Sequence, residues 1–211
     1  MKKQLSIVLC IAMIFAMLVT LSGCGEKEKD KFVGTWKTDL DMTEMINEGF
    51  SEDADMATYF KFDEFKITMV FTFNEDGTYK SDIDEDAFNT AYDGLVQSFT
   101  KGMKDYLEAT AKKQGLNLSA DEMLKLSGTT MDAAIKESLN KDTLKNSFDE
   151  IKGEGTFEAK DGNLILTDSK TNETSGESYE FVSDSELKLV KPANSDGEEL
   201  NKIYPLILKK K

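Results

Sequence analysis

The sequence contains no histidine and no arginine, so all 26 of its basic residues are lysines. Without histidine, the chain lacks the commonest general base and the usual nitrogen ligand of zinc. Without arginine, it lacks the bidentate clamp that binds carboxylates and phosphates. Cysteine occurs only at Cys10 and Cys24. These absences exclude most enzyme classes and the usual zinc sites, so we expect no catalytic residue, no metal site and no cofactor.

Basic charge is scarce relative to acidic charge. Forty Asp and Glu residues give the 211-residue chain a formal net charge of −14 at pH 7. A surface of this sign repels the anionic backbone of nucleic acids, so we expect no nucleic-acid partner. A chain with this many carboxylates always offers some carboxylate pair. The chain therefore contains the residue types for a hydrolase that uses two carboxylates, or a serine with a lysine. This enzyme class stays an alternative for that reason alone.

Short β-prone runs make up much of the chain. Residues 66–73 alternate with a period of two and place Ile67, Met69, Phe71 and Phe73 on one face, which predicts a strand with an inner side. Turn residues such as Asp161-Gly162 separate many of the other runs. The predicted strands are 32–38, 66–73, 78–81, 155–160, 163–167, 178–182, 186–191 and 203–208.

Eight short strands joined mostly by tight turns favour an antiparallel meander that closes into a barrel, because closure removes exposed edges. An open α+β sandwich is the main alternative. Asp41 and Glu44 have the spacing of a capping box and predict a short helix after the first strand. Apolar residues recur every three or four positions from Phe88 to Leu107, which predicts a helical insertion at about 85–148 between strands three and four. We therefore expect an α+β fold.

The acidic run at 82–86 could suggest calcium. It departs from the EF-hand pattern, because Ala87 stands where that loop requires glycine and Asp93 where it requires glutamate. Negative charge in the first turn of the long helix accounts for the run better, so we predict no metal there.

The N-terminal segment resembles a bacterial lipoprotein signal peptide. Two lysines precede an apolar stretch at 5–21, and Leu21-Ser22-Gly23-Cys24 is similar to a lipobox. The resemblance implies cleavage before Cys24 and a diacylglyceryl group on Cys24, whose two acyl chains attach a protein stably to a membrane. An uncleaved transmembrane anchor is the alternative.

This resemblance sets the expected organisation of the chain. Residues 1–23 would be the signal peptide, residues 24–31 a charged tether and residues 32–211 a single domain. The protein would be lipid-anchored at the cell membrane and face the extracytoplasmic side, because the N-terminal lysines stay inside. With Cys24 acylated, the mature chain would have neither a free thiol nor a disulfide.

A second resemblance concerns the barrel. Gly34-Thr35-Trp36 is similar to the Gly-x-Trp that opens the first strand of lipocalins, and residues 32–37 resemble the start of intracellular fatty-acid-binding proteins. Both families belong to the calycin group of barrels that bind small ligands. Gly77-Thr78-Tyr79 and Gly155-Thr156-Phe157 repeat the Gly-Thr-aromatic unit. The resemblance implies a lipocalin-like domain.

The chain also departs from these families. In lipocalins the tryptophan packs under an arginine near the last strand, and fatty-acid-binding proteins hold the ligand carboxylate with arginines. This chain has no arginine, so that machinery is not carried over. The helical insertion is a further departure.

Two main functional hypotheses follow, and the resemblance of the strand pattern to ligand-binding barrels favours the first. In the first, the barrel binds a small apolar or amphipathic ligand. In the second, side chains fill the barrel, and the protein is an interaction or structural module of the cell envelope whose helical insertion contacts an unidentified protein. The residues expected to line a cavity, or to form the core, are Trp36, Ile67, Met69, Phe71 and Phe73.

Overall fold

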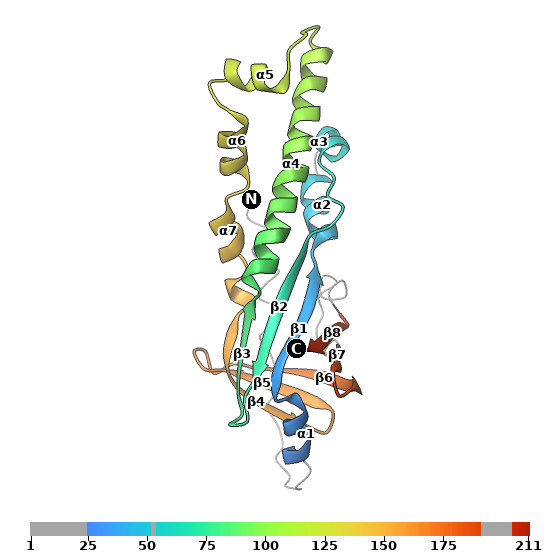
Figure 1. Cartoon of the computed structure of the whole chain (residues 1–211), viewed down its shortest axis with the longest axis vertical. Helices are drawn as coiled ribbons and strands as arrows, with labels where there is room; N and C mark the ends of the chain where they lie inside the picture. The colour runs from blue at the N-terminus through green and yellow to red at the C-terminus, as the bar shows by residue number, and fades with distance from the viewer. Residues whose placement is uncertain (1–24, 52–53, 191–203) are drawn as a thin grey trace. The chain divides into compact units, whose positions relative to one another are not determined.

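The computed structural model describes residues 25–51, 54–190 and 204–211 (Figure 1). Its strands form a closed antiparallel barrel in which each strand pairs with the next and β8 pairs with β1, so the predicted eight-stranded barrel is confirmed. The strands are β1 (Gly34–Asp41), β2 (Lys66–Phe73), β3 (Thr78–Ile83), β4 (Gly153–Lys160), β5 (Asn163–Asp168), β6 (Thr174–Ser183), β7 (Glu186–Val190) and β8 (Leu206–Lys210).

Helices precede and interrupt the barrel strands in the sequence. One precedes β1, two lie between β1 and β2, and several lie between β3 and β4. They are α1 (Gly25–Phe32), α2 (Thr43–Ser51), α3 (Ala54–Tyr59), α4 (Glu85–Lys113), α5 (Ala120–Leu126), α6 (Met131–Ser138) and α7 (Lys141–Asn146), with a short 3₁₀ helix at Asp149–Ile151.

The chain divides into two compact units, although the sequence predicts one domain with a single insertion. The barrel unit contains α1, most of the barrel strands and the chain after residue 148. The helical unit combines two segments, 41–67 and 85–148, rather than the second alone.

Aromatic packing joins the two segments of the helical unit. The Phe60 ring lies 5.3 Å from that of Phe50 and 5.0 Å from that of Phe99 on α4, measured between centroids. A Cβ added to Gly102 would lie only 2.7 Å from the Tyr59 carbonyl oxygen, so the glycine permits this close approach. These contacts join segments about 40 positions apart, which local spacing could not predict.

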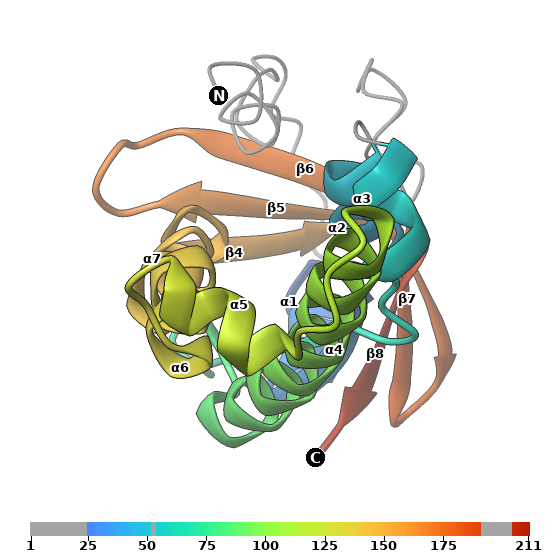
Figure 2. The same cartoon turned by 90° about the horizontal axis from the view of Figure 1, so that it is seen from above.

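Within the helical unit, the helices after α4 return alongside it (Figure 2). The Tyr92 hydroxyl donates to the Leu139 carbonyl at 2.7 Å, and Lys145 pairs with Glu85. The Ser119 side chain and the Glu122 carboxylate form a capping box at the start of α5. The contacts of Glu85 and Tyr92 fix the returning chain to the first turns of the long helix.

The segment expected to be a charged tether, 24–31, is instead mostly helix α1, and the first strand begins at Gly34 rather than at Phe32. Phe32, the last residue of α1, is completely buried in the barrel core. A buried ring at its end draws this highly charged segment onto the barrel, because burying a phenylalanine gains roughly 1.5–3 kcal/mol.

Candidate functional site

The interior of the barrel is the first candidate site. Its core is built from inward-facing residues of nearly every strand, together with one residue of α1. The buried members are Phe32, Trp36, Phe73, Tyr79, Phe157, Ala159, Leu164, Leu187, Leu189 and Leu208. Phe71, Leu166, Tyr179, Phe181, Tyr204 and Leu206 are partly buried against them.

The Phe32 ring lies at the centre of this aromatic packing. Its centroid lies 4.8 Å from that of Tyr179, 5.0 Å from that of Phe181 and 5.5 Å from that of Phe73, all in edge-to-face geometry. Phe157 follows at 6.1 Å. Edge-to-face pairs at these distances are favourable. Phe32 thus occupies space inside the barrel that a small ligand would need.

Hydrogen bonds hold α1 in this position. The Trp36 indole N–H donates to the Phe32 carbonyl oxygen, with 2.6 Å between Nε1 and O. The Tyr179 hydroxyl donates to the Glu28 carboxylate at 2.9 Å. Burial and the adjacent Glu28 carboxylate raise the pKa of Tyr179 well above its usual value, so the phenol keeps its proton and remains a donor.

Trp36 is covered by a lysine of the last strand. Lys210 is its register partner across the β1–β8 seam, and the Lys210 Nζ lies 5.1 Å from the centroid of the indole ring. A cation at this distance is attracted by the π-face of the ring. Gly34 makes room for the lysine: its φ is +128°, and an added Cβ would lie 2.8 Å from Lys210 Cε.

Two lysines of α1 make similar contacts. Lys29 Nζ lies 5.7 Å from the centroid of Phe157, and Lys31 Nζ lies 5.6 Å from that of Phe181. Lys210 Nζ also donates to the Lys31 carbonyl at 3.5 Å. Ammonium groups therefore surround the end of the barrel that α1 occupies.

The predicted lining residues have different locations. Trp36 and Phe73 are buried in the barrel core, and Phe71 is partly buried against it, with its ring stacked 6.4 Å from that of Phe73. Met69 and Ile67 are buried farther along β2, and Ile67 belongs to the helical unit. Only three of the five thus meet in the barrel core.

Cys24, the predicted lipidation site, lies outside the described residues. The three Gly-Thr-aromatic units fall on β1, β3 and β4, or begin at the residue before the strand. Their aromatic residues Trp36, Tyr79 and Phe157 all lie in the barrel core.

One carboxylate shares the inner face of β6 with Tyr179 and Phe181. Glu177 pairs in register with the buried Leu164 and accepts a hydrogen bond from the Tyr204 hydroxyl at 2.6 Å. Burial raises the pKa of Glu177, although the hydrogen bond from Tyr204 lowers it in part. Burial, together with the Glu177 carboxylate, raises the pKa of Tyr204. One carboxyl with a phenol donor does not form the paired carboxylates that a glycosidase requires.

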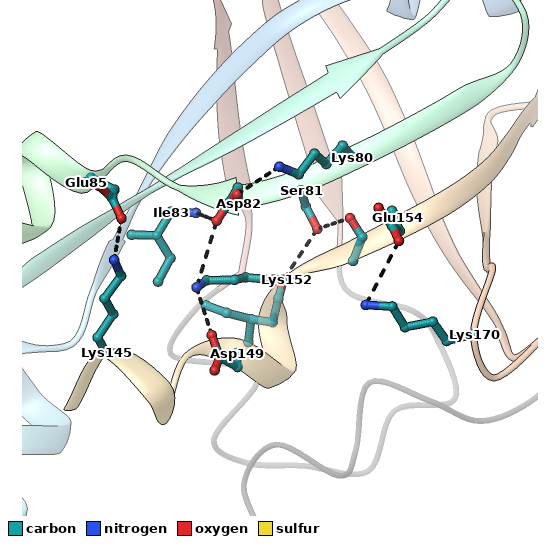
Figure 3. A network of polar contacts seen from close by, with 12 residues as sticks. Lys80, Ser81, Asp82, Ile83, Glu85, Lys145, Asp149, Lys152, Glu154 and Lys170 are labelled. Carbon is teal, nitrogen blue, oxygen red and sulfur yellow. Dashed lines mark hydrogen bonds and ion pairs between the residues drawn. The ribbon is translucent and has the colours of Figure 1, made fainter. Parts of the chain in front are cut away.

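The acidic run at 82–86 engages lysines rather than a cation site (Figure 3). Asp82 lies 3.1 Å from Lys80 and 3.9 Å from Lys152. Asp84 accepts from Lys37 at 2.5 Å. Within the described ranges, no group of three or more Cys, Asp or Glu residues is arranged to hold a metal ion.

The helical unit carries a second candidate surface. A shallow depression of about 360 Å³, open to solvent, lies along α4 and is lined by Val96, Gln97, Thr100, Lys101, Lys104 and Asp105. Two large apolar side chains of the same unit are exposed: Leu126, at the end of α5, by 75%, and Leu116, after α4, by 45%. A shallow depression that is open to solvent suits a protein contact better than a small molecule, because small-molecule sites are concave and bury most of the ligand surface.

Sequence reasoning missed two residues of the barrel site. The β-prone run at 32–38 predicts a strand at Phe32, although Glu and Lys three positions apart, as in Glu28 and Lys31, are typical of a helix. Lys210 gave no local signal, because only the closure of the barrel brings it to Trp36.

Comparisons with protein-family models, with curated proteins and with solved structures find no match to this chain. Among the helices of residues 25–51, 54–190 and 204–211, none is both long and apolar enough to span a bilayer.

Proposed function

We propose that this protein is a non-catalytic lipoprotein, anchored through acylated Cys24 to the extracytoplasmic side of a bacterial cell membrane. The lipobox-like Leu21-Ser22-Gly23-Cys24 after an apolar stretch supports the anchor. The lack of histidine and arginine supports a non-catalytic role. The anchor would confine the protein to the envelope, where its partners would be other envelope components.

The barrel would be a lipocalin-like scaffold. Its support is the pairing of Trp36 with a cation on the last strand, the place where lipocalins have an arginine. Lys210 would supply the same charge over the same ring. Gly34, which accommodates the lysine stem, supports the similarity to the Gly-x-Trp motif.

The position of Phe32 is the observation that favours protein interaction over ligand binding. Its ring contacts four other aromatic rings in the barrel, and Phe73 and Phe157 lie 4.8 Å apart beside it. A packed interior favours a filled barrel over one that accepts a small apolar ligand. The protein would therefore act as an envelope interaction or structural module.

The helical unit would provide the contact surface, and its partner would be a second envelope protein. Support comes from the exposed Leu126 and Leu116 and from the depression along α4, which presents both lysine and aspartate side chains. Protein interfaces combine apolar area with polar and charged side chains, and the depression along α4 presents both.

Site-specific photocrosslinking in intact cells tests this role. A photoreactive residue at Leu126 or Gln97 is expected to capture one reproducible envelope protein. The matched control is the same residue at Val182 of β6, which is also exposed but belongs to the barrel unit. The proposal would be contradicted if all three positions crosslinked the same protein equally, or if the helical positions crosslinked none. A small molecule retained in native mass spectra of the purified protein would favour ligand binding instead.

A further inference from the structure

Helix α1 is the part of the barrel unit that lies closest in the sequence to the proposed anchor residue. Gly25, the residue after Cys24 in the sequence, is the first residue of α1. The helix is eight residues long, which corresponds to about 12 Å. The same eight residues as an extended tether would reach up to about 28 Å.

The helix is also part of the barrel fold rather than an appendage. Phe32 is completely buried among the core aromatics, its carbonyl accepts from Trp36, and Glu28 accepts from Tyr179. Side-chain contacts thus begin within the first turn of α1 and continue to its last residue. Swinging α1 away from the barrel would require withdrawing the Phe32 ring, which is unfavourable because it exposes a fully buried aromatic side chain to water.

We infer that α1 is a rigid membrane stalk, which holds the α1 end of the barrel against the lipid headgroups. The inference rests on the proposed acylation of Cys24. The lipid surface is the partner, because the acylated residue would lie one helix length from the barrel core. The barrel would consequently have a fixed orientation on the membrane.

The charge of this end suits a headgroup layer without requiring anionic lipid. Lys29 and Lys31 of α1 and Lys210 of β8 present ammonium groups at this end, where they lie over the rings of Phe157, Phe181 and Trp36. The β2–β3 turn, which contains Asp76, lies beside Lys29: a Cβ added to Gly77 would lie 2.6 Å from Lys29 Nζ. Ammonium and carboxylate groups together complement the paired charges of a zwitterionic headgroup.

The only tryptophan of the chain is a reporter for this end, because Trp36 contacts Phe32. The experiment uses the acylated full chain in phosphatidylcholine vesicles with a dansyl-labelled headgroup lipid, and it measures energy transfer from Trp36. A 12-residue Gly-Ser insertion directly before Gly25 adds about 19 Å of flexible spacing. It is expected to lower the transfer at least about twofold, because transfer falls with the sixth power of distance.

The matched control carries the same insertion beside Gly115, an exposed position of the helical unit with open space around it. This variant is expected to keep the transfer of the natural chain. Amine acetylation gives a second readout: Lys29 and Lys31 should react more slowly on vesicles than in detergent, and the insertion before Gly25 should remove that protection.

The possible failures are distinguishable. If intact-mass analysis shows no diacylglyceryl group and the chain does not float with vesicles, the proposed anchor fails, and the stalk fails with it. If the acylated chain floats but neither transfer nor acetylation responds to the insertion before Gly25, the rigid stalk is wrong and the anchor stands.

Discussion

Lys210 lies over Trp36 across the seam where the barrel closes, with its ammonium nitrogen 5.1 Å from the centre of the indole ring. The two residues are 174 positions apart in the sequence and are register partners in adjacent strands. The contact therefore forms only when β8 pairs with β1, and it couples barrel closure to the burial of the only tryptophan.

Replacing Lys210 tests this contact. Lys210→Met keeps most of the apolar stem but removes the charge, so we expect the free energy of unfolding to fall by about 0.5–1 kcal/mol. Lys210→Arg is the matched control and should retain the stability of the natural chain. Urea denaturation followed by Trp36 fluorescence measures both. Equal stability of the Met and natural chains would show that the cation contributes nothing.

Phe32 should be among the most sensitive positions of the chain. Phe32→Ala removes the ring that contacts four other aromatics, and we expect a loss of roughly 3–5 kcal/mol in the free energy of unfolding. Leu126→Ala, at a side chain that is 75% exposed, should change it by no more than about 0.5 kcal/mol. Thermal unfolding by circular dichroism compares the two. A small effect at Phe32 would mean that α1 is not integrated in the barrel.

Two glycines of α4 should respond oppositely to alanine. Gly94 is exposed with open space around it, so Gly94→Ala should stabilise the protein by about 0.5–1 kcal/mol through helix propensity. Gly102→Ala should destabilise it, because the new Cβ would lie 2.7 Å from the Tyr59 carbonyl oxygen and 2.9 Å from the Phe60 ring. Melting temperatures of the two variants give the sign of each effect. Stabilisation by both would argue against the close packing of α3 on α4.

Glu177 should make stability depend on pH. Its pKa is raised by burial, so the folded state binds the proton more tightly than the unfolded state does. The stabilisation by the protonated form is therefore lost as pH rises through the folded-state pKa. Glu177→Gln stays neutral and can still accept from Tyr204, so its melting temperature should exceed that of the natural chain at about pH 8.

The difference between Glu177→Gln and the natural chain should shrink as pH falls towards 4.5, the ordinary pKa of a glutamate. Melting curves of both chains between these pH values test it. A difference that stays constant with pH would show that Glu177 is not buried in its charged form.

Local patterns were enough to predict the strands of the barrel. The sequence predicted β2 with its correct bounds from the alternation of Ile67, Met69, Phe71 and Phe73. Successive side chains of a strand point to opposite faces, so this pattern can be recognised without the structure. Turn residues such as Asp161-Gly162 separated neighbouring strands, and the number of short strands favoured closure. Ile67 nevertheless belongs to the helical unit, because alternation identifies a face without identifying what packs on it.

The sequence by itself determined the strand order, the exclusion of histidine and arginine chemistry, and the expectation that Cys24 is acylated. Only the tertiary structure decided that 25–32 is a helix plugged into the barrel by Phe32, that Lys210 covers Trp36, and that 41–67 and 85–148 form one unit. Strand alternation and turn chemistry depend on neighbours in the sequence. Three features depend instead on contacts between distant residues: the burial of Phe32 inside the barrel, the position of Lys210 over the indole ring, and the joining of the two helical segments. These contacts exist only after the chain has folded.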